Sequence, residues 1–193
     1  MLRILQESDL ELVLLWRNAP AIRQAMFTQH EITLEEHLAW FQRIRVDAGV
    51  RCFLFLDKEG IPCGVVSFTG IDVRQSNAFW GFYAKPLAMP GTGMRLSLDA
   101  LNYAFGELGL YKVNAEVLGS NPRSIEMHKK VGFIEEGRFR EHFFNGEERV
   151  DVIRLGLLAT EWPSCRTLLE SRLAERDTLE LTRAFINPNP ENT

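Results

Sequence analysis

The sequence has few cysteines, no surplus of basic residues and no long apolar run. Its three cysteines, Cys52, Cys63 and Cys165, are odd in number and form no CxxC pair, which argues against a disulfide framework and against a zinc site. Such cysteine usage favours a reduced, cytoplasmic compartment. The net charge of −4 argues against a nucleic-acid-binding surface, and no apolar run is long enough to span a bilayer. A small anionic ligand in a local basic pocket stays possible.

The chain of 193 residues, with 46% hydrophobic and 25% charged residues, is long enough for one domain with a real core. Apolar spacing predicts strands over residues 2–6, 51–57, 61–69, 78–83, 112–118, 133–144 and 148–158, and helices after Ser8, Pro20 and Thr33 and over 94–108 and 121–132. We therefore expect one α+β domain over residues 1–160 around a central, mostly antiparallel sheet. A helical extension over 161–186 and a disordered tail over 187–193 are expected to follow.

Local signals fix several of these elements. Ser8 followed by Glu11, and Thr33 followed by Glu36, are typical of capping boxes. Asn145-Gly146 between two strand-like runs predicts a hairpin. Gly81 inside a predicted strand suggests a bulge or a close approach of another backbone. Gly109 is expected to close the helix over residues 94–108.

The segment from Asn121 to Phe133 predicts a capped helix that turns directly into a strand. Asn121 is a good N-cap, Pro122 suits the first helical position, and Gly132 suits a left-handed C-terminal position. The residues between them follow the pattern N-x-x-(S/A)-x-x-x-(Y/H)-x-K-x-G-F. Asn121 is either a plain helix cap or a ligand contact as well.

A second motif lies upstream, in the breaker-rich loop 86–93 between a predicted strand and a predicted helix. Gly91 and Gly93 match the pattern (Q/R)-x-x-G-x-(G/A), whereas Ala88 departs from its first position. Glycines allow a phosphate to approach the backbone, and free amides at a helix start point towards it. An ordinary strand–helix turn is the other interpretation.

Together the two motifs resemble those of the GCN5-related N-acetyltransferases (GNAT). The resemblance implies a twisted sheet flanked by helices, whose two middle strands splay apart around the pantetheine arm of acetyl-CoA, the implied co-substrate. The implied coenzyme-binding residues are Phe82, Tyr83, Pro90, Gly91, Thr92, Gly93, Met94, Asn121 and Lys130. Backbone amides supply this cradle, so it survives the change at Ala88.

Two residues are candidates for proton transfer. His128 stands where the family usually carries a tyrosine that protonates the departing thiolate, so the resemblance implies that His128 is the general acid. Glu116, in the strand 112–118, is a candidate for accepting the amine proton through water. The alternatives are that His128 is a helical histidine without a catalytic role and that Glu116 is a solvated strand residue without one. The proposed direct transfer needs no metal, and no cysteine lies beside a recognisable base.

The stretches 16–27 and 32–41 carry the pattern WRN-x-P-x-(I/V)-R and a later I-(S/T)-x-x-x-H-x-x-(F/W). They resemble two branches of the superfamily, the ribosomal-protein N-terminal acetyltransferases and, more closely, the nucleotide-sugar acetyltransferases of pseudaminic acid biosynthesis. The implied substrate-binding residues are Arg17, Met26, Phe27, His37, Trp40, Ser67 and Thr69. In this interpretation arginine and histidine suit a diphosphate, and Met26, Phe27 and Trp40 wall the base. Helix packing is the alternative role for those three.

The resemblance therefore implies an N-acetyltransferase that moves acetyl from acetyl-CoA to the 4-amino group of a UDP-linked 4-amino-4,6-dideoxy sugar. The alternatives are an N-terminal protein acetyltransferase and a coenzyme-binding module without turnover. The leucines of the tail fit a homodimer and packing within one chain equally well.

Overall fold

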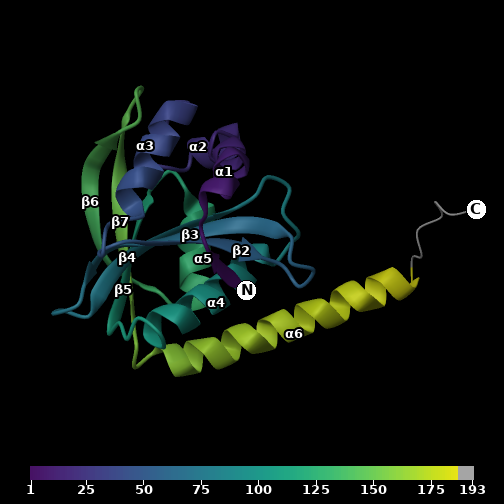
Figure 1. Ribbon diagram of the computed structural model, residues 1–193. Helices are drawn as coiled ribbons and strands as arrows, with labels where there is room; N and C mark the ends of the chain where they lie inside the picture. Colours follow the sequence, from purple (N-terminus) through teal and green to yellow (C-terminus); the bar gives the residue numbers. More distant parts are fainter. Residues whose placement is uncertain (187–193) are drawn as a thin grey trace, which may run out of the picture.

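A seven-stranded sheet forms the middle of the molecule, and helices cover both of its faces (Figure 1). The computed structural model describes residues 1–186. The strands are β1 (Leu2–Ile4), β2 (Arg51–Leu56), β3 (Pro62–Asp72), β4 (Asn77–Ala84), β5 (Lys112–Leu118), β6 (Ile134–Phe144) and β7 (Arg149–Leu158). The helices are α1 (Leu10–Arg17), α2 (Pro20–Arg23), α3 (Leu34–Ile44), α4 (Thr92–Phe105), α5 (Pro122–Val131) and α6 (Trp162–Ile186). The predicted disorder of residues 187–193 lies outside the described residues.

The strand order is β1-β2-β3-β4-β5-β7-β6, and β4–β5 is the one parallel pair among the described strands. The predicted α+β class and the mostly antiparallel sheet are thereby confirmed. Two hydrophobic cores lie on opposite faces of this sheet. Because side chains alternate along a strand, Phe53 and Phe55 of β2 join the core beneath α4, α5 and α6. Cys52, Leu54 and Leu56 join the core beneath α1 and α3, which explains the unbroken apolar run of β2.

The sheet divides between β4 and β5. These strands pair only at Asn77–Lys112, Ala78–Val113 and Phe79–Asn114, whereas β5 continues to pair with β7 as far as Leu118. At the end of the paired region the side-chain amide of Asn114 donates to the Ala78 carbonyl at 3.2 Å. Beyond it, the facing backbone edges of β4 and β5 form no ladder. This wedge is the splay that the sequence motifs imply.

Three local predictions are wrong in detail. The capping box at Ser8–Glu11 does not form: a 3-10 turn spans Glu7–Asp9, and α1 begins at Leu10. The Asp9 carboxylate accepts from the Gln6 amide at 2.8 Å and is held by Arg3 at 2.8 and 3.0 Å, so this acid sets the helix start. Gly81 keeps a regular register with Ser67, and the irregularity of β3 lies between Thr69 and Asp72.

The helix over residues 94–108 is shorter than predicted. α4 ends at Phe105, where the Gly106 amide bonds the Asn102 carbonyl. Gly109 adopts a φ of +60° only after a further turn. The other predicted boundaries agree with the structure to within a few residues. The hairpin at Asn145 is confirmed, and its side chain accepts from the amides of Glu147 and Glu148 at 2.9 and 2.8 Å.

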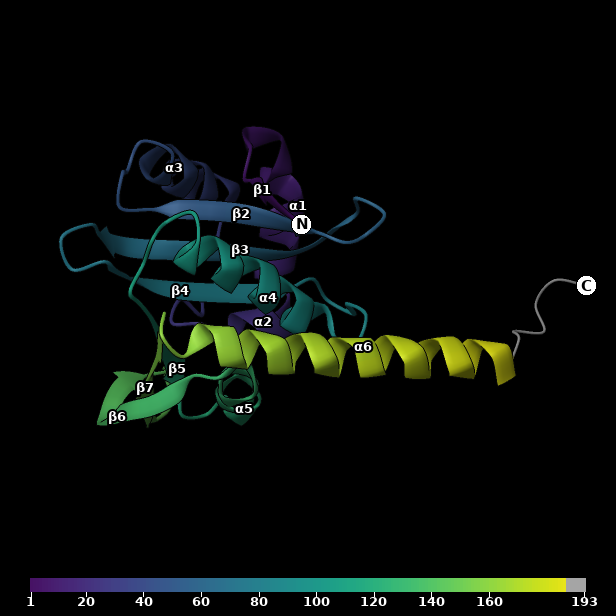
Figure 2. The same ribbon diagram turned by 90° about the horizontal axis from the view of Figure 1, so that it is seen from below.

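Helix α6 lies along α4 and α5, and its C-terminal half projects past the domain (Figure 2). Trp162 donates to Asn102 of α4 at 3.1 Å, and Leu169 and Leu173 are buried. This packing uses the helix's own domain, so the predicted homodimer stays a prediction. The sequence predicts that apolar residues of this helix, Leu181 and Phe185 among them, pack on the domain or on a second subunit, but these two side chains lie outside those that the structure describes. Among residues 1–186, no helix combines the length and apolar character needed to cross a bilayer.

Candidate active site

The start of α4 lies beside the open end of the wedge. Gly91 is the N-cap of α4 with a φ of +90°, a conformation that favours glycine. A Cβ at Gly93 would meet Met127 of α5 at 3.6 Å and Phe82 of β4 at 3.8 Å, so this turn faces both walls of the wedge. The first amides of a helix have no partner within it. A glycine turn with helix-start amides fits the pyrophosphate of the co-substrate that the motifs imply.

Helix α5 forms the neighbouring wall. The Asn121 side chain accepts from the Ser124 amide at 3.1 Å, and Gly132 takes a φ of +114° at the other end. Both predicted caps are therefore confirmed. This short, capped helix fixes His128 on its inner face, where 5% of the side chain is exposed.

His128 lies in an aromatic box. Its ring centroid is 5.6 Å from that of Trp80, 5.7 Å from Phe82 and 5.2 Å from Phe133. Nδ1 lies 2.7 Å from the Ser124 carbonyl oxygen, which can only accept, so Nδ1 carries the proton. Burial lowers the pKa of His128. The ring is therefore neutral near pH 7, with the lone pair on Nε2.

Glu116 is engaged by a cation. Its carboxylate accepts from Arg154 at 2.6 and 3.1 Å, and the same guanidinium lies 4.5 Å from the centroid of the Phe79 ring. Val113, Ala115 and Val117 of the same strand face the core beneath α4 and α5, so Glu116 points to the opposite face of the sheet from His128.

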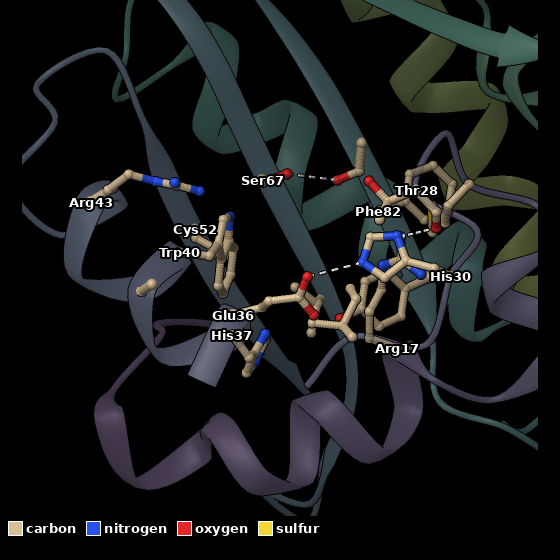
Figure 3. Close-up of a pocket in the computed structure, with 16 residues that line it drawn as sticks. Arg17, Thr28, His30, Glu36, His37, Trp40, Arg43, Cys52, Ser67 and Phe82 are labelled. Atoms are coloured by element: carbon tan, nitrogen blue, oxygen red, sulfur yellow. Dashed lines mark hydrogen bonds and ion pairs between the residues drawn. The ribbon is translucent and has the colours of Figure 1, made fainter. Parts of the chain in front are cut away.

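A cavity of about 570 Å³ lies on the α1–α3 face of the sheet, next to the wedge (Figure 3). Five of the seven predicted substrate residues line it together with Phe82 and Tyr83; the five are Arg17, Met26, His37, Trp40 and Ser67. The structure thus brings together residues from α1, the segment after α2, α3, β3 and β4.

The other two predicted substrate residues do not line this cavity. Phe27 packs edge-on against Phe143 of β6 at 5.4 Å. Thr69 is exposed near the end of the regular β3–β4 ladder, two residues after Ser67 on the same strand. Phe27 lies in the loop between α2 and α3 and Thr69 at the exposed part of β3, so the spacing of residues in the sequence does not fix either position.

The cavity contains two buried polar atoms that lack a partner among the described residues, Nη1 of Arg17 and Nε2 of His37. The second nitrogen of Arg17, Nη2, donates to the Thr28 carbonyl at 2.8 Å, which aims the guanidinium. The His37 ring is 4% exposed and stacks on Trp40 at 5.0 Å and 17°. Burial, and then the nearby Arg17 charge, lower the pKa of His37. An unpaired buried guanidinium nitrogen is costly, so Nη1 of Arg17 is suited to an oxygen of a polar, anionic ligand group.

Sequence reasoning did not identify several lining residues. Glu36 and His30 pair across the cavity mouth at 3.2 Å, and Arg43 adds a cation. Glu36 is also the residue of the α3 capping box that accepts from the Thr33 amide, and the sequence pattern indicates only this capping role. Gly81 lines the cavity, and a Cβ there would meet nothing within 4 Å. The absent side chain creates space in the cavity, whereas the sequence suggests either a bulge or a close approach of another backbone.

Cys52 forms part of the cavity wall, but burial raises its pKa to about 12. It therefore stays a thiol at neutral pH and is unsuited to nucleophilic attack. Burial also raises the pKa of Tyr83, whose phenol lies near Arg17. A neutral phenol and a neutral thiol leave Arg17 and Arg43 as the permanent cations of this cavity.

Comparison with known proteins places these features in a family. The family model described as "Acetyltransferase (GNAT) domain" matches residues 1–134. "Acetyltransferase PseH" of Campylobacter jejuni (strain 81-176) is 32% identical over 129 residues, 67% of this chain and 79% of that protein. "Spermidine N(1)-acetyltransferase" of Vibrio cholerae is 26% identical and covers 83% of this chain and 94% of that protein. The crystal structure of spermidine N-acetyltransferase from Vibrio cholerae in complex with CoA and spermine superimposes with a TM-score of 0.78 at 26% identity, covering 84% and 96% of the two chains.

Proposed function

This chain belongs to the GNAT family and is an acetyl-CoA-dependent N-acetyltransferase, and from that premise we propose that its acceptor is the 4-amine of a UDP-linked 4-amino-4,6-dideoxy sugar. The observation that carries the proposal is the buried, unpartnered Nη1 of Arg17 beside His37 and Trp40 in the cavity next to the wedge. A diphosphate supplies the oxygens that such a corner lacks, and the indole of Trp40 is a flat surface for a base.

The co-substrate is proposed to lie in the wedge between β4 and β5. Backbone groups of Phe82 and Tyr83 have no strand partner on that side and are free to pair with pantetheine amides as a strand edge does. Its phosphates would meet the start of α4, formed by Pro90, Gly91, Thr92, Gly93 and Met94, with Asn121 and Lys130 of α5 alongside. The amides near Tyr83 would polarise the thioester carbonyl.

We propose that His128 carries the proton between amine and sulfur. In the neutral ring Nε2 has a lone pair, because Nδ1–H is donated to the Ser124 carbonyl. Nε2 therefore accepts the proton that the amine loses on attack and returns it to the departing thiolate, which balances the reaction without a second base. Glu116 as the proton acceptor remains a prediction, and its ion pair with Arg154 favours a positioning role.

Charge discriminates between the acceptor classes. Polyamines and basic peptides require carboxylates, and among the described lining residues Glu36 is the single carboxylate, paired with His30. Arg17 and Arg43 are permanent cations on the same wall. This balance supports an anionic acceptor over spermidine, and over the peptide of the alternative N-terminal protein acetyltransferase.

The test is a thiol-release assay with acetyl-CoA and three acceptors: the UDP-4-amino-4,6-dideoxy sugar, spermidine and a ribosomal-type N-terminal peptide. We expect turnover with the amino sugar nucleotide alone, and competitive inhibition by UDP. Turnover with spermidine or the peptide in preference to the nucleotide sugar would contradict the proposal. Tight CoA binding without thiol release on any amine would instead support the module without turnover.

A further inference from the structure

The C-terminal helix α6 brings a cation to the start of α4. A Cβ built on Gly91 would lie 3.1 Å from both Cδ and Nε of Arg176 and 3.7 Å from its Cζ. The Arg176 guanidinium therefore lies directly over the glycine turn, on a helix that starts after the segment matched by the family model. Figure 2 shows α6 passing this end of α4 before it projects from the domain.

The turn itself supplies no cationic side chain. Its residues from Ala88 to Met94 are uncharged, and Ala88 stands where the motif has glutamine or arginine. Backbone amides bind a phosphate through hydrogen bonds. A diphosphate also carries negative charge, which a guanidinium can neutralise while it donates two parallel hydrogen bonds. Arg176 reaches the same place from a different element of the fold.

The position of Arg176 is fixed by its neighbours on α6. The adjacent residue, Asp177, accepts from Nη1 of Arg95 on α4 at 3.2 Å and lies 3.7 Å from Lys58. One turn earlier, Arg172 donates to the Lys130 carbonyl of α5 at 2.7 Å. These contacts hold α6 in register against α4 and α5.

We propose that Arg176 binds the pyrophosphate of coenzyme A, so that α6 supplies the cationic contact that Ala88 does not. The inference rests on the proposed position of the coenzyme at the start of α4, and it is independent of the acceptor. It makes α6 a part of the coenzyme site.

The test compares acetyl-CoA with S-acetylpantetheine, which has the same thioester and no phosphate. In the full-length protein, Arg176→Ala should raise the Kd for CoA, measured by calorimetry without acceptor, and the KM for acetyl-CoA by about 10- to 100-fold. The kcat/KM for S-acetylpantetheine should be unchanged, and Arg176→Lys should restore part of the affinity. Arg166→Ala is the matched control, because Arg166 is exposed on the same helix and pairs with Glu170; it should change neither constant.

Three outcomes would overturn the inference: unchanged CoA affinity, tighter binding, or an equal loss with S-acetylpantetheine. Gly93→Val separates this failure from failure of the proposed coenzyme position, since its Cβ would make only ordinary contacts with Met127 and Phe82 and circular dichroism checks that the variant is folded. If Gly93→Val weakens CoA binding and Arg176→Ala does not, the role of Arg176 is wrong. If neither variant weakens it, the coenzyme does not lie at this turn.

Discussion

Replacing His128 with phenylalanine tests the proton pathway. Phenylalanine has nearly the shape of the imidazole and suits a box made of Trp80, Phe82 and Phe133. The change removes the Nδ1–H bond to Ser124, which contributes about 0.5–1.5 kcal/mol, and it removes the cost of burying a polar ring. We therefore expect a free energy of unfolding within about 1 kcal/mol of the parent protein at pH 8.

Turnover should fall by about 100- to 10,000-fold, the range of general acid–base catalysis. The KM for acetyl-CoA should change little, because the ring does not contribute to the proposed phosphate or amide contacts. Stopped-flow thiol release under saturating substrates measures the turnover, and calorimetry with CoA measures the affinity. Unchanged turnover in a folded protein would remove His128 from the reaction.

The pH profile separates a proton carrier from a simple acid. Burial lowers the pKa of His128 in the folded protein, so a neutral Nε2 that accepts the amine proton is lost only as the pH falls through that lowered pKa. Turnover should therefore increase with pH across the acidic range in which His128 loses its proton, and stay level above about pH 6.5. In His128→Phe this increase should be absent. Turnover that instead declines as the pH rises through that pKa would mean that the ring must begin protonated, which contradicts the proposed pathway.

The same shift gives a stability prediction of fixed sign. The unfolded chain binds a proton near pH 6.5, whereas folded His128 binds it at a lower pH, so the free energy of unfolding falls as the pH decreases below about 6.5. The pKa of His37 is lowered by burial as well and acts in the same direction. His128→Phe should accordingly remove only part of this pH dependence.

The remaining predictions concern the acceptor cavity. Trp40→Ala should raise the KM for the nucleotide sugar about tenfold and leave the KM for acetyl-CoA nearly unchanged, since the indole stacks on His37 in the cavity wall; equal effects on both constants would identify a packing residue. Gly81→Val should preserve or increase the melting temperature, because a Cβ there meets nothing and valine favours strands, yet it should weaken acceptor binding more than CoA binding. A destabilised Gly81→Val protein with normal acceptor affinity would mean that the space at Gly81 serves the fold.

Local signals in the sequence predict most of the fold. Asn121, Pro122 and Gly132 mark α5 correctly because caps depend on residues within one turn. The box at Thr33 and Glu36 forms with both bonds, at 2.7 and 3.2 Å. The box at Ser8 does not form, because Asp9 instead accepts from the Gln6 amide and moves the cap two residues upstream. Arg3 of β1 holds the same carboxylate, and this contact lies outside the four residues of the capping pattern.

The candidate site is predictable to the extent that motifs fix backbone shape. Gly91 and Gly93 correctly indicate the turn at the start of α4. Arg17 and Trp40, both predicted to bind the substrate, line the same cavity. The partner of Glu116 is not predictable, because Arg154 reaches it across the β5–β7 pairing. Arg176 is likewise far from Gly91 in sequence, and only the packing of α6 on α4 brings them together.

The parting of β4 and β5 has a mechanical consequence. Three residue pairs join the half-sheet β1–β4 to the half-sheet β5-β7-β6, so we expect the two half-sheets to open about this short ladder. A ligand that hydrogen-bonds to both half-sheets acts as an inserted strand and couples their opening motions. Occupancy of the gap should therefore slow amide hydrogen exchange in both half-sheets at once, including β6, which lies at the outer edge of the sheet.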